Sequence, residues 1–122
     1  MKAFKLALAG ALLFAGPASA ADIVGTWLRS NGESRVRMTK CGGGVCGVIT
    51  WLKNPAKTEA KVGQQVFYDM KEDGGVWTGT AFNPEDGRTY TGKASISGPN
   101  MTTKGCVFGG LICKTVTWTR VN

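Results

Sequence analysis

The sequence predicts an all-β fold, a small eight-stranded antiparallel up-and-down barrel with two disulfides. Three observations predict it. Strand-forming residues alternate with polar residues along most of the chain, glycine-rich turns recur at short intervals, and four cysteines occur in two close pairs. No window after residue 21 shows the apolar spacing of an amphipathic helix. Short strands in hairpin order are typical of an up-and-down barrel, and a β-sandwich is the alternative.

Eight segments have the composition and length of strands, and turn residues such as Asn31-Gly32 and Asp73-Gly74-Gly75 separate them. The expected strands are Val24–Ser30, Ser34–Lys40, Val45–Lys53, Gln65–Lys71, Val76–Phe82, Thr89–Ser97, Met101–Val107 and Ile112–Val121. The segment NPAKTEAKVGQQ, residues 54–65, lacks apolar spacing. We expect a long loop there, with room for one helical turn.

The side chains of a strand alternate between its two faces, which predicts the core. Val36 and Met38 share one face, opposite Arg35 and Arg37. Two further sets share a face by the same rule. They are Val66, Tyr68 and Met70, and Tyr90, Gly92, Ala94 and Ile96.

The first twenty residues have the pattern of a bacterial secretory signal peptide. Lys2 and Lys5 precede an apolar run of about ten residues, which is too short to span a bilayer. Ala18-Ser19-Ala20 then supplies the small residues of a cleavage site. The sequence therefore predicts cleavage after Ala20, a single domain over residues 21–122, and a periplasmic or secreted protein without an integral membrane segment.

The charge is moderately positive. Removing Lys2 and Lys5 lowers the formal net charge from +7 to +5. A basic protein favours acidic partners such as envelope polymers and lipid head groups, but scattered basic residues also serve solubility alone. The basic residues here are scattered along the chain. Because an exported protein does not regulate genes, we expect no nucleic-acid partner.

The four cysteines are Cys41, Cys46, Cys106 and Cys113. An even number in an exported domain predicts disulfides, and four cysteines allow three pairings. Local pairing, Cys41 with Cys46 and Cys106 with Cys113, is favoured because each intervening segment resembles a hairpin tip. Each short loop would add about 2 kcal/mol. A zinc site is the alternative, but the spacings are poor for zinc ribbons.

The stretch NPEDGRTYTG, residues 83–92, looks most like a motif. Pro84 suits a type I turn, Asp86 tolerates the bridge region, and Gly87 supplies a positive φ. A calcium loop would need oxygen ligands at regular spacing, and Glu85 is too close to Asp86 for the two to act as a catalytic acid pair. The sequence therefore predicts a turn made by Pro84, Glu85, Asp86 and Gly87.

The sequence offers few residues that could support catalysis or metal binding. The chain has no histidine, which removes the usual general base and metal ligand. Disulfide-bonded cysteines are not nucleophiles, and the acidic residues lie mostly in predicted turns. We expect no catalytic residues, no metal and no cofactor.

Aromatic residues are the remaining functional signal. Trp27, Trp51, Trp77 and Trp118 lie on four predicted strands, and Phe67 and Tyr90 lie on two others. They either pack a filled core or line a cavity for an apolar ligand, since eight-stranded barrels can hold one small molecule. The candidate ligand-binding residues are Trp51, Phe67, Trp77, Tyr90 and Trp118.

The stretches GTW, CGGGVCGVITWLKNP, GTAFNPEDGRTYTGKASISG and GCVFGGLICKTVTWTRV together resemble the bacterial secreted family called domain of unknown function 2147. The resemblance implies a periplasmic or secreted lipocalin-like barrel with no established activity. In lipocalin-like barrels a Gly-x-Trp near the start packs under an Arg of the last strand, a cation–π contact that closes the base. Trp27 and Arg120 match those positions. The segment Pro84 to Tyr90 matches a turn motif of the family.

Two functions follow as hypotheses. The first is binding of a small apolar or amphipathic ligand at the barrel mouth by a monomer. The alternative is an envelope interaction module that binds a protein or anionic polymer through its basic surface.

Overall fold

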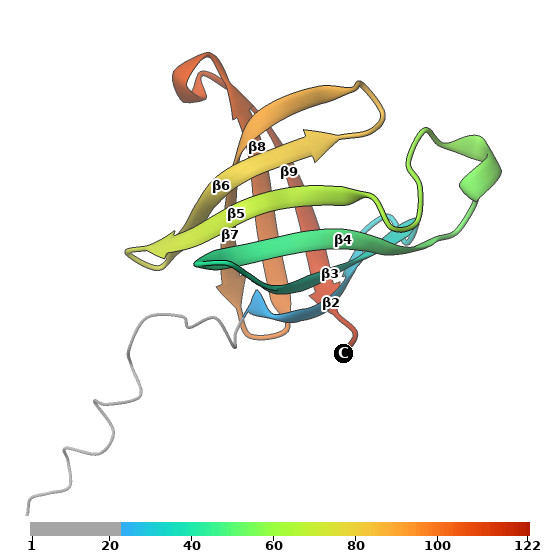
Figure 1. Cartoon of the computed structure of the whole chain (residues 1–122), viewed down its shortest axis with the longest axis horizontal. Helices are drawn as coiled ribbons and strands as arrows, with labels where there is room; N and C mark the ends of the chain where they lie inside the picture. The colour runs from blue at the N-terminus through green and yellow to red at the C-terminus, as the bar shows by residue number, and fades with distance from the viewer. Residues whose placement is uncertain (1–22) are drawn as a thin grey trace, which may run out of the picture.

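The structure, a computed structural model, describes residues 23–122, and the expected signal peptide lies outside them. The described residues form a closed barrel of eight antiparallel strands in hairpin order (Figure 1). The strands are β2 (Gly25–Arg29), β3 (Ser34–Cys41), β4 (Gly44–Leu52), β5 (Gln65–Asp73), β6 (Val76–Asn83), β7 (Arg88–Ser97), β8 (Asn100–Val107) and β9 (Ile112–Arg120). Every predicted strand is present. The predicted long loop between β4 and β5 contains one turn of 3-10 helix, η1 (Pro55–Lys57).

The barrel closes between its first and last strands, where Trp27 pairs with Arg120. The guanidinium of Arg120 lies 4.3 Å from the centre of the Trp27 ring and donates a hydrogen bond to the Val24 carbonyl at 2.9 Å. The Trp27 indole donates to the Ile23 carbonyl at 2.9 Å. Gly25 has a φ of +143°, and a Cβ there would lie 2.6 Å from Nη1 of Arg120. A side chain at the glycine of the Gly-x-Trp motif would therefore clash with the arginine that covers the Trp27 ring.

One end of the barrel is filled with side chains. Its residues are almost fully buried, and three methionines are among them because flexible thioethers fill irregular space well. They are Ile23, Trp27, Met38, Val45, Met70, Trp77, Ala94 and Met101. The predicted inward face of β3 is confirmed by Val36 and Met38, and that of β7 by Gly92 and Ala94.

Bulges in β4 and β5 change which side chains point inward. In β4 the register shifts so that Val36 pairs with Ile49 and Arg35 pairs with Trp51, which leaves Thr50 as an extra residue. Because one extra residue reverses the alternation, Trp51 points outward and Leu52 points inward. Without the bulge, Trp51 would share the inward face of Ile49.

The bulge in β5 lies between Tyr68 and Lys71 and contains Asp69, whose φ is +50°. The predicted inward set Val66, Tyr68 and Met70 is wrong at Tyr68, which is 40% exposed, whereas Met70 is fully buried. The neighbouring strands make room with glycine. A Cβ at Gly79 would lie 2.6 Å from the Tyr68 carbonyl oxygen.

Both disulfides of the favoured pairing are present, Cys41–Cys46 at the β3–β4 turn and Cys106–Cys113 at the tip of β8 and β9. Disulfides are typical of proteins in an oxidising compartment. Within residues 23–122, no helix is long and apolar enough to cross a membrane.

We expect each disulfide to contribute about 2 kcal/mol to the free energy of unfolding, because each closes only a short loop. Replacing either pair with alanine should therefore lower the urea midpoint modestly and leave a cooperative transition. Equilibrium denaturation of the two double variants beside the oxidised protein measures this. If loss of one pair unfolded the domain, the eight-strand core would not be the main source of stability.

Candidate functional site

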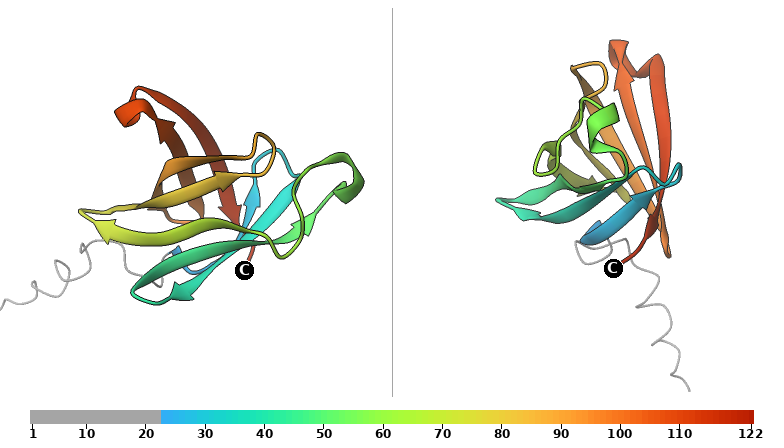
Figure 2. Two further views of the ribbon diagram at one scale, coloured as in Figure 1. Left: turned by 45° about the horizontal axis from the view of Figure 1, so that its top comes forward. Right: turned by 90° about the vertical axis from the view of Figure 1, so that its right-hand side faces the viewer.

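A cavity of about 830 Å³ opens at one end of the barrel. This is the end that carries the β2–β3, β4–β5, β6–β7 and β8–β9 connections, and the loop with η1 projects beside it (Figure 2). The residues that fill the opposite end do not line the cavity. Its apolar lining consists of Val36, Ile49, Leu52, Ala60, Val66, Phe67, Ala81, Phe82, Tyr90, Val116 and Trp118. The barrel is thus half filled and half open.

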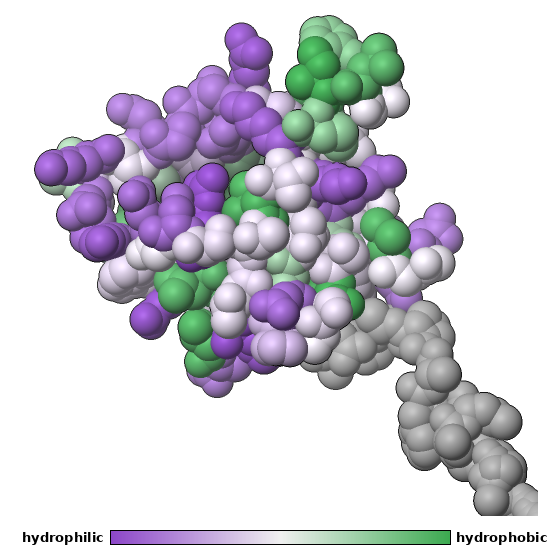
Figure 3. All heavy atoms as spheres, turned by 180° about the vertical axis from the view of Figure 1, so that it is seen from behind, coloured by the Kyte–Doolittle hydropathy of each residue, from purple (hydrophilic) through white to green (hydrophobic). Residues whose placement is uncertain are grey.

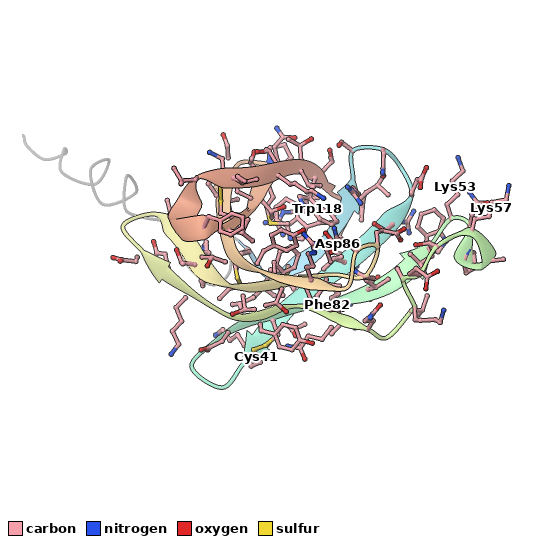
Figure 4. All side chains as sticks on the ribbon, turned by 90° about the horizontal axis from the view of Figure 1, so that it is seen from above. Cys41, Lys53, Lys57, Phe82, Asp86 and Trp118 are labelled. Carbon is pink, nitrogen blue, oxygen red and sulfur yellow. A yellow bond between two sulfur atoms is a disulfide. The ribbon has the colours of Figure 1, made fainter. Side chains whose placement is uncertain are left out.

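Two aromatic rings separate the cavity from the filled end, and we call Phe67 and Trp118 the aromatic floor. Their rings meet edge to face, with centroids 6.3 Å apart and planes at 69°. Phe67 reaches inward past Gly47, where a Cβ would lie 2.8 Å from its ring. Trp118 lies inside the barrel (Figure 4) and pairs with Met101 of the filled end. The aromatic floor therefore rests directly on the packed core.

The polar atoms of the floor satisfy one another. The Trp118 indole donates to the Thr103 hydroxyl at 2.9 Å, and that hydroxyl donates to the Val116 carbonyl at 3.4 Å. Thr103 is the polar residue that is buried in the described barrel. Because these groups are paired, the inner half of the cavity presents an apolar surface.

The rim of the cavity is polar. The β6–β7 turn is the predicted one: the Asn83 side chain accepts from the Glu85 N–H at 3.0 Å, and Gly87 has a φ of +68°. The Thr58 hydroxyl of the β4–β5 loop donates to the Glu85 carboxylate. This hydrogen bond joins the β4–β5 loop to the β6–β7 turn across the rim.

Asp86 connects the same turn to the barrel wall. Its carboxylate accepts from the Tyr90 hydroxyl and from the Arg88 N–H at 2.9 Å, and it lies 3.7 Å from the Lys114 ammonium. The hydrogen bond from Tyr90 is the main cause that lowers the pKa of Asp86, and the same bond raises the pKa of Tyr90. Asp86 is therefore ionised at neutral pH, and this contact is lost only as the pH falls through its lowered pKa.

Three of the five predicted ligand-binding residues, Phe67, Tyr90 and Trp118, lie together in the cavity lining. Trp77 is 4% exposed and belongs to the filled end. Trp51 is 37% exposed on the outer surface, where the Arg35 guanidinium lies 5.0 Å from its ring centre. The candidate site therefore contains three aromatic residues, and Trp51 and Trp77 lie outside it.

Sequence reasoning did not single out Thr103, Lys114 or Arg29, which also line the cavity. Strand alternation could have found Lys114, because it shares a face with Val116 and Trp118. Nothing in the sequence marked Thr103 as the partner of an indole. Among residues 23–122, no group of three or more His, Cys, Asp or Glu side chains is placed to hold a metal ion.

An antiparallel eight-stranded barrel with one packed end and one open, apolar end is a lipocalin-like barrel. A solved structure, protein HP1028 from Helicobacter pylori, described as belonging to the lipocalin family, matches with a TM-score of 0.64. The two chains are 18% identical, and the match covers 82% of this chain and 83% of the other. At that identity the likeness shows the fold alone. A comparison with curated proteins finds no match.

The family model described as "Uncharacterized protein conserved in bacteria (DUF2147)" matches residues 25–120. The chain belongs to this family. The matched range begins at the glycine of the Gly-x-Trp motif and ends at Arg120, so it spans the whole closed barrel.

Proposed function

We propose that this protein is an exported, monomeric carrier that binds one small, largely apolar or amphipathic molecule in the open end of its barrel. The observation that carries the proposal is the cavity of about 830 Å³ above the aromatic floor. Sites for small molecules typically measure about 300–1,000 Å³ and combine apolar walls with a few polar groups.

The lining also indicates how such a ligand would lie. Its apolar part would contact Phe67, Trp118 and Val116, whose polar neighbours are already paired. A polar end would lie at the rim, where charged side chains of both signs, among them Arg29, Lys114 and Glu85, line the cavity. The lipocalin-like fold favours binding over catalysis. We propose no metal or cofactor for this site.

Export to the periplasm or the medium is supported by the signal-peptide pattern of residues 1–20 and by two disulfides. Native mass spectrometry of protein purified from the periplasm, without refolding, tests export and binding together. We expect a monomer that begins at residue 21 and carries extra mass removable by organic solvent. A bare monomer that takes up no added amphiphile would contradict the proposal.

Quenching of tryptophan fluorescence locates the ligand. A brominated fatty acid quenches indoles that it touches, and among the four tryptophans Trp118 lines the cavity. We expect Trp118→Phe to abolish most of the quenching while keeping an aromatic floor. Trp51→Phe, on the outer surface, and Trp77→Phe, in the filled end, are the matched controls and should leave it intact. Loss of quenching in Trp51→Phe instead would place the ligand outside the barrel.

A further inference from the structure

The tip of β8 and β9 exposes three large apolar side chains. Phe108, Leu111 and Ile112 are 73%, 86% and 57% exposed, and we call them the apolar tip. They project from the barrel as one green cluster at the upper right of Figure 3, and the tip stands apart from the other loops in the left view of Figure 2. Exposed apolar side chains that cluster in this way mark interaction sites more often than scattered ones do.

The conformation of the tip is constrained, although its three apolar side chains do not belong to the barrel core. The Cys106–Cys113 disulfide closes its base. Phe108 has a φ of +54°, a conformation that bulky residues rarely adopt and that costs about 1–3 kcal/mol. The barrel core does not include any of the three side chains. Core packing therefore does not explain why these three positions are apolar.

The charged residues of the last three strands are all basic. The basic residues are scattered along the chain, as expected, but the acidic residues are not. All eight lie at or before Asp86, and the residues after it carry only positive charge. The basic residues there are Arg88, Lys93, Lys104, Lys114 and Arg120. The excess positive charge of residues 21–122 thus belongs to the sheet of β7, β8 and β9.

Three of these lysines lie close to the tip. Lys93 and Lys104 are direct cross-strand neighbours and both are exposed, although like charges in that position repel. Lys114 follows Ile112 by two residues and is also exposed, with Asp86 at 3.7 Å as the acid that faces it. An external anionic surface would offset the repulsion between Lys93 and Lys104.

We propose that the apolar tip inserts into the surface of a bilayer that contains anionic phospholipid, while the lysines behind it contact the head groups. At roughly 3.3 Å per strand residue, Lys114 and Lys104 lie about 7 and 10 Å behind Ile112, the innermost residue of the apolar tip. The interfacial layer of a bilayer is about 5–8 Å thick on each side, so an inserted tip places the lysines at head-group level.

Docking in this way brings the cavity to the membrane. Lys104, Gly105, Lys114 and Thr115, which flank the tip, also belong to the cavity lining. A lipocalin-like carrier that exchanges an amphiphile with a bilayer would need this arrangement. The inference nevertheless goes beyond the proposed function, because membrane docking does not require an occupied cavity.

Sedimentation with vesicles tests the proposal. The oxidised protein should bind vesicles of equal parts phosphatidylcholine and phosphatidylglycerol, bind vesicles of phosphatidylcholine much less, and bind more weakly as salt rises. Leu111→Ser should lower the partition coefficient at least about tenfold. Phe108→Asn should also lower it, and asparagine suits the positive φ. The control is Val62→Ser, a loop residue that is 59% exposed, and it should bind as the wild type does.

Lys104→Gln should reduce binding about fivefold, and Lys40→Gln, an exposed lysine near the opposite end, serves as its control. Equal binding of wild type and Leu111→Ser would overturn the proposal, as would binding that depends on Lys104 but not on the tip. If Leu111→Ser instead changed the oligomeric state in size-exclusion chromatography without changing vesicle binding, the tip would be a contact between copies and the proposal would be wrong.

Discussion

Replacing Trp27 with alanine should lower the free energy of unfolding by about 3–5 kcal/mol, the largest effect of a single substitution that we predict. Trp27 is fully buried at the junction of the first and last strands. Its removal leaves a cavity beneath Arg120 and deprives the guanidinium of the ring it covers. Since domains of this size are stable by only about 5–15 kcal/mol, the variant should be largely unfolded in moderate urea.

A charge-removing variant separates packing from the cation–π contact. Arg120→Met keeps an unbranched apolar stem but loses the contact with Trp27 and the hydrogen bond to the Val24 carbonyl. We expect a loss of about 2 kcal/mol, smaller than that of Trp27→Ala. Urea denaturation followed by circular dichroism, which does not depend on Trp27 fluorescence, measures both variants.

The barrel supplies its own control for this pair. Arg35 and Trp51 form the same type of contact on the exposed outer surface, at 5.0 Å rather than 4.3 Å. Because solvent weakens such contacts, Arg35→Met should cost less than about 1 kcal/mol. Equal losses for Arg35→Met and Arg120→Met would mean that burial at the closure adds nothing.

The fold could be predicted because its signals are local. Alternation along β3 and β7 and the turn residues between strands determine the hairpin order, and hairpin order with eight strands leaves few ways to bury the apolar faces. The Gly-x-Trp and Trp-Thr-Arg sequences, although far apart, mark the two strands that close the barrel. The nearness of the cysteines within each pair likewise favoured local disulfides.

The bulges could not be predicted, because an extra residue leaves no mark in the pattern of apolar and polar residues. Thr50 looks like an ordinary strand residue, yet it reverses the direction of Trp51 and removes it from the interior. The bulge at Asp69 likewise makes Tyr68 and Met70 point to opposite faces. The bulge at Asp69 also depends on the two neighbouring strands. Gly44 and Gly79 leave room for its backbone, which a side chain at either position would contact.

The cavity is a property of the whole barrel and not of any motif. Five aromatic residues were predicted to bind a ligand, and three of them line the cavity. Trp77 differs from these three in its height along the barrel, and Trp51 differs because its side chain points outward. Phe67 and Trp118 lie just above the three methionines that fill the base. No local sequence pattern predicts the boundary between the filled half and the open half of the barrel. Side chains from strands that are distant in sequence determine that boundary.

Filling the cavity should abolish binding while preserving the fold. Ala81 and Val116 are partly buried lining residues on the walls. Tryptophan at both positions would occupy space that the proposed ligand needs. Losing about 100 Å² of apolar contact corresponds to roughly 2.5–3 kcal/mol, so we expect affinity for an amphiphile to fall about a hundredfold. Because the new rings enter open volume, the free energy of unfolding should change by less than about 1.5 kcal/mol.

Titration of the double variant with the brominated fatty acid measures the affinity, and its urea midpoint checks the fold. Trp51→Ala is the matched control, because it alters an aromatic residue on the outer surface and should leave affinity unchanged. Full affinity in Ala81→Trp/Val116→Trp would exclude the barrel interior as the site. Since the apolar tip lies outside the cavity, the same variant should still bind anionic vesicles, and this difference separates a blocked carrier from a protein that has lost its membrane contact.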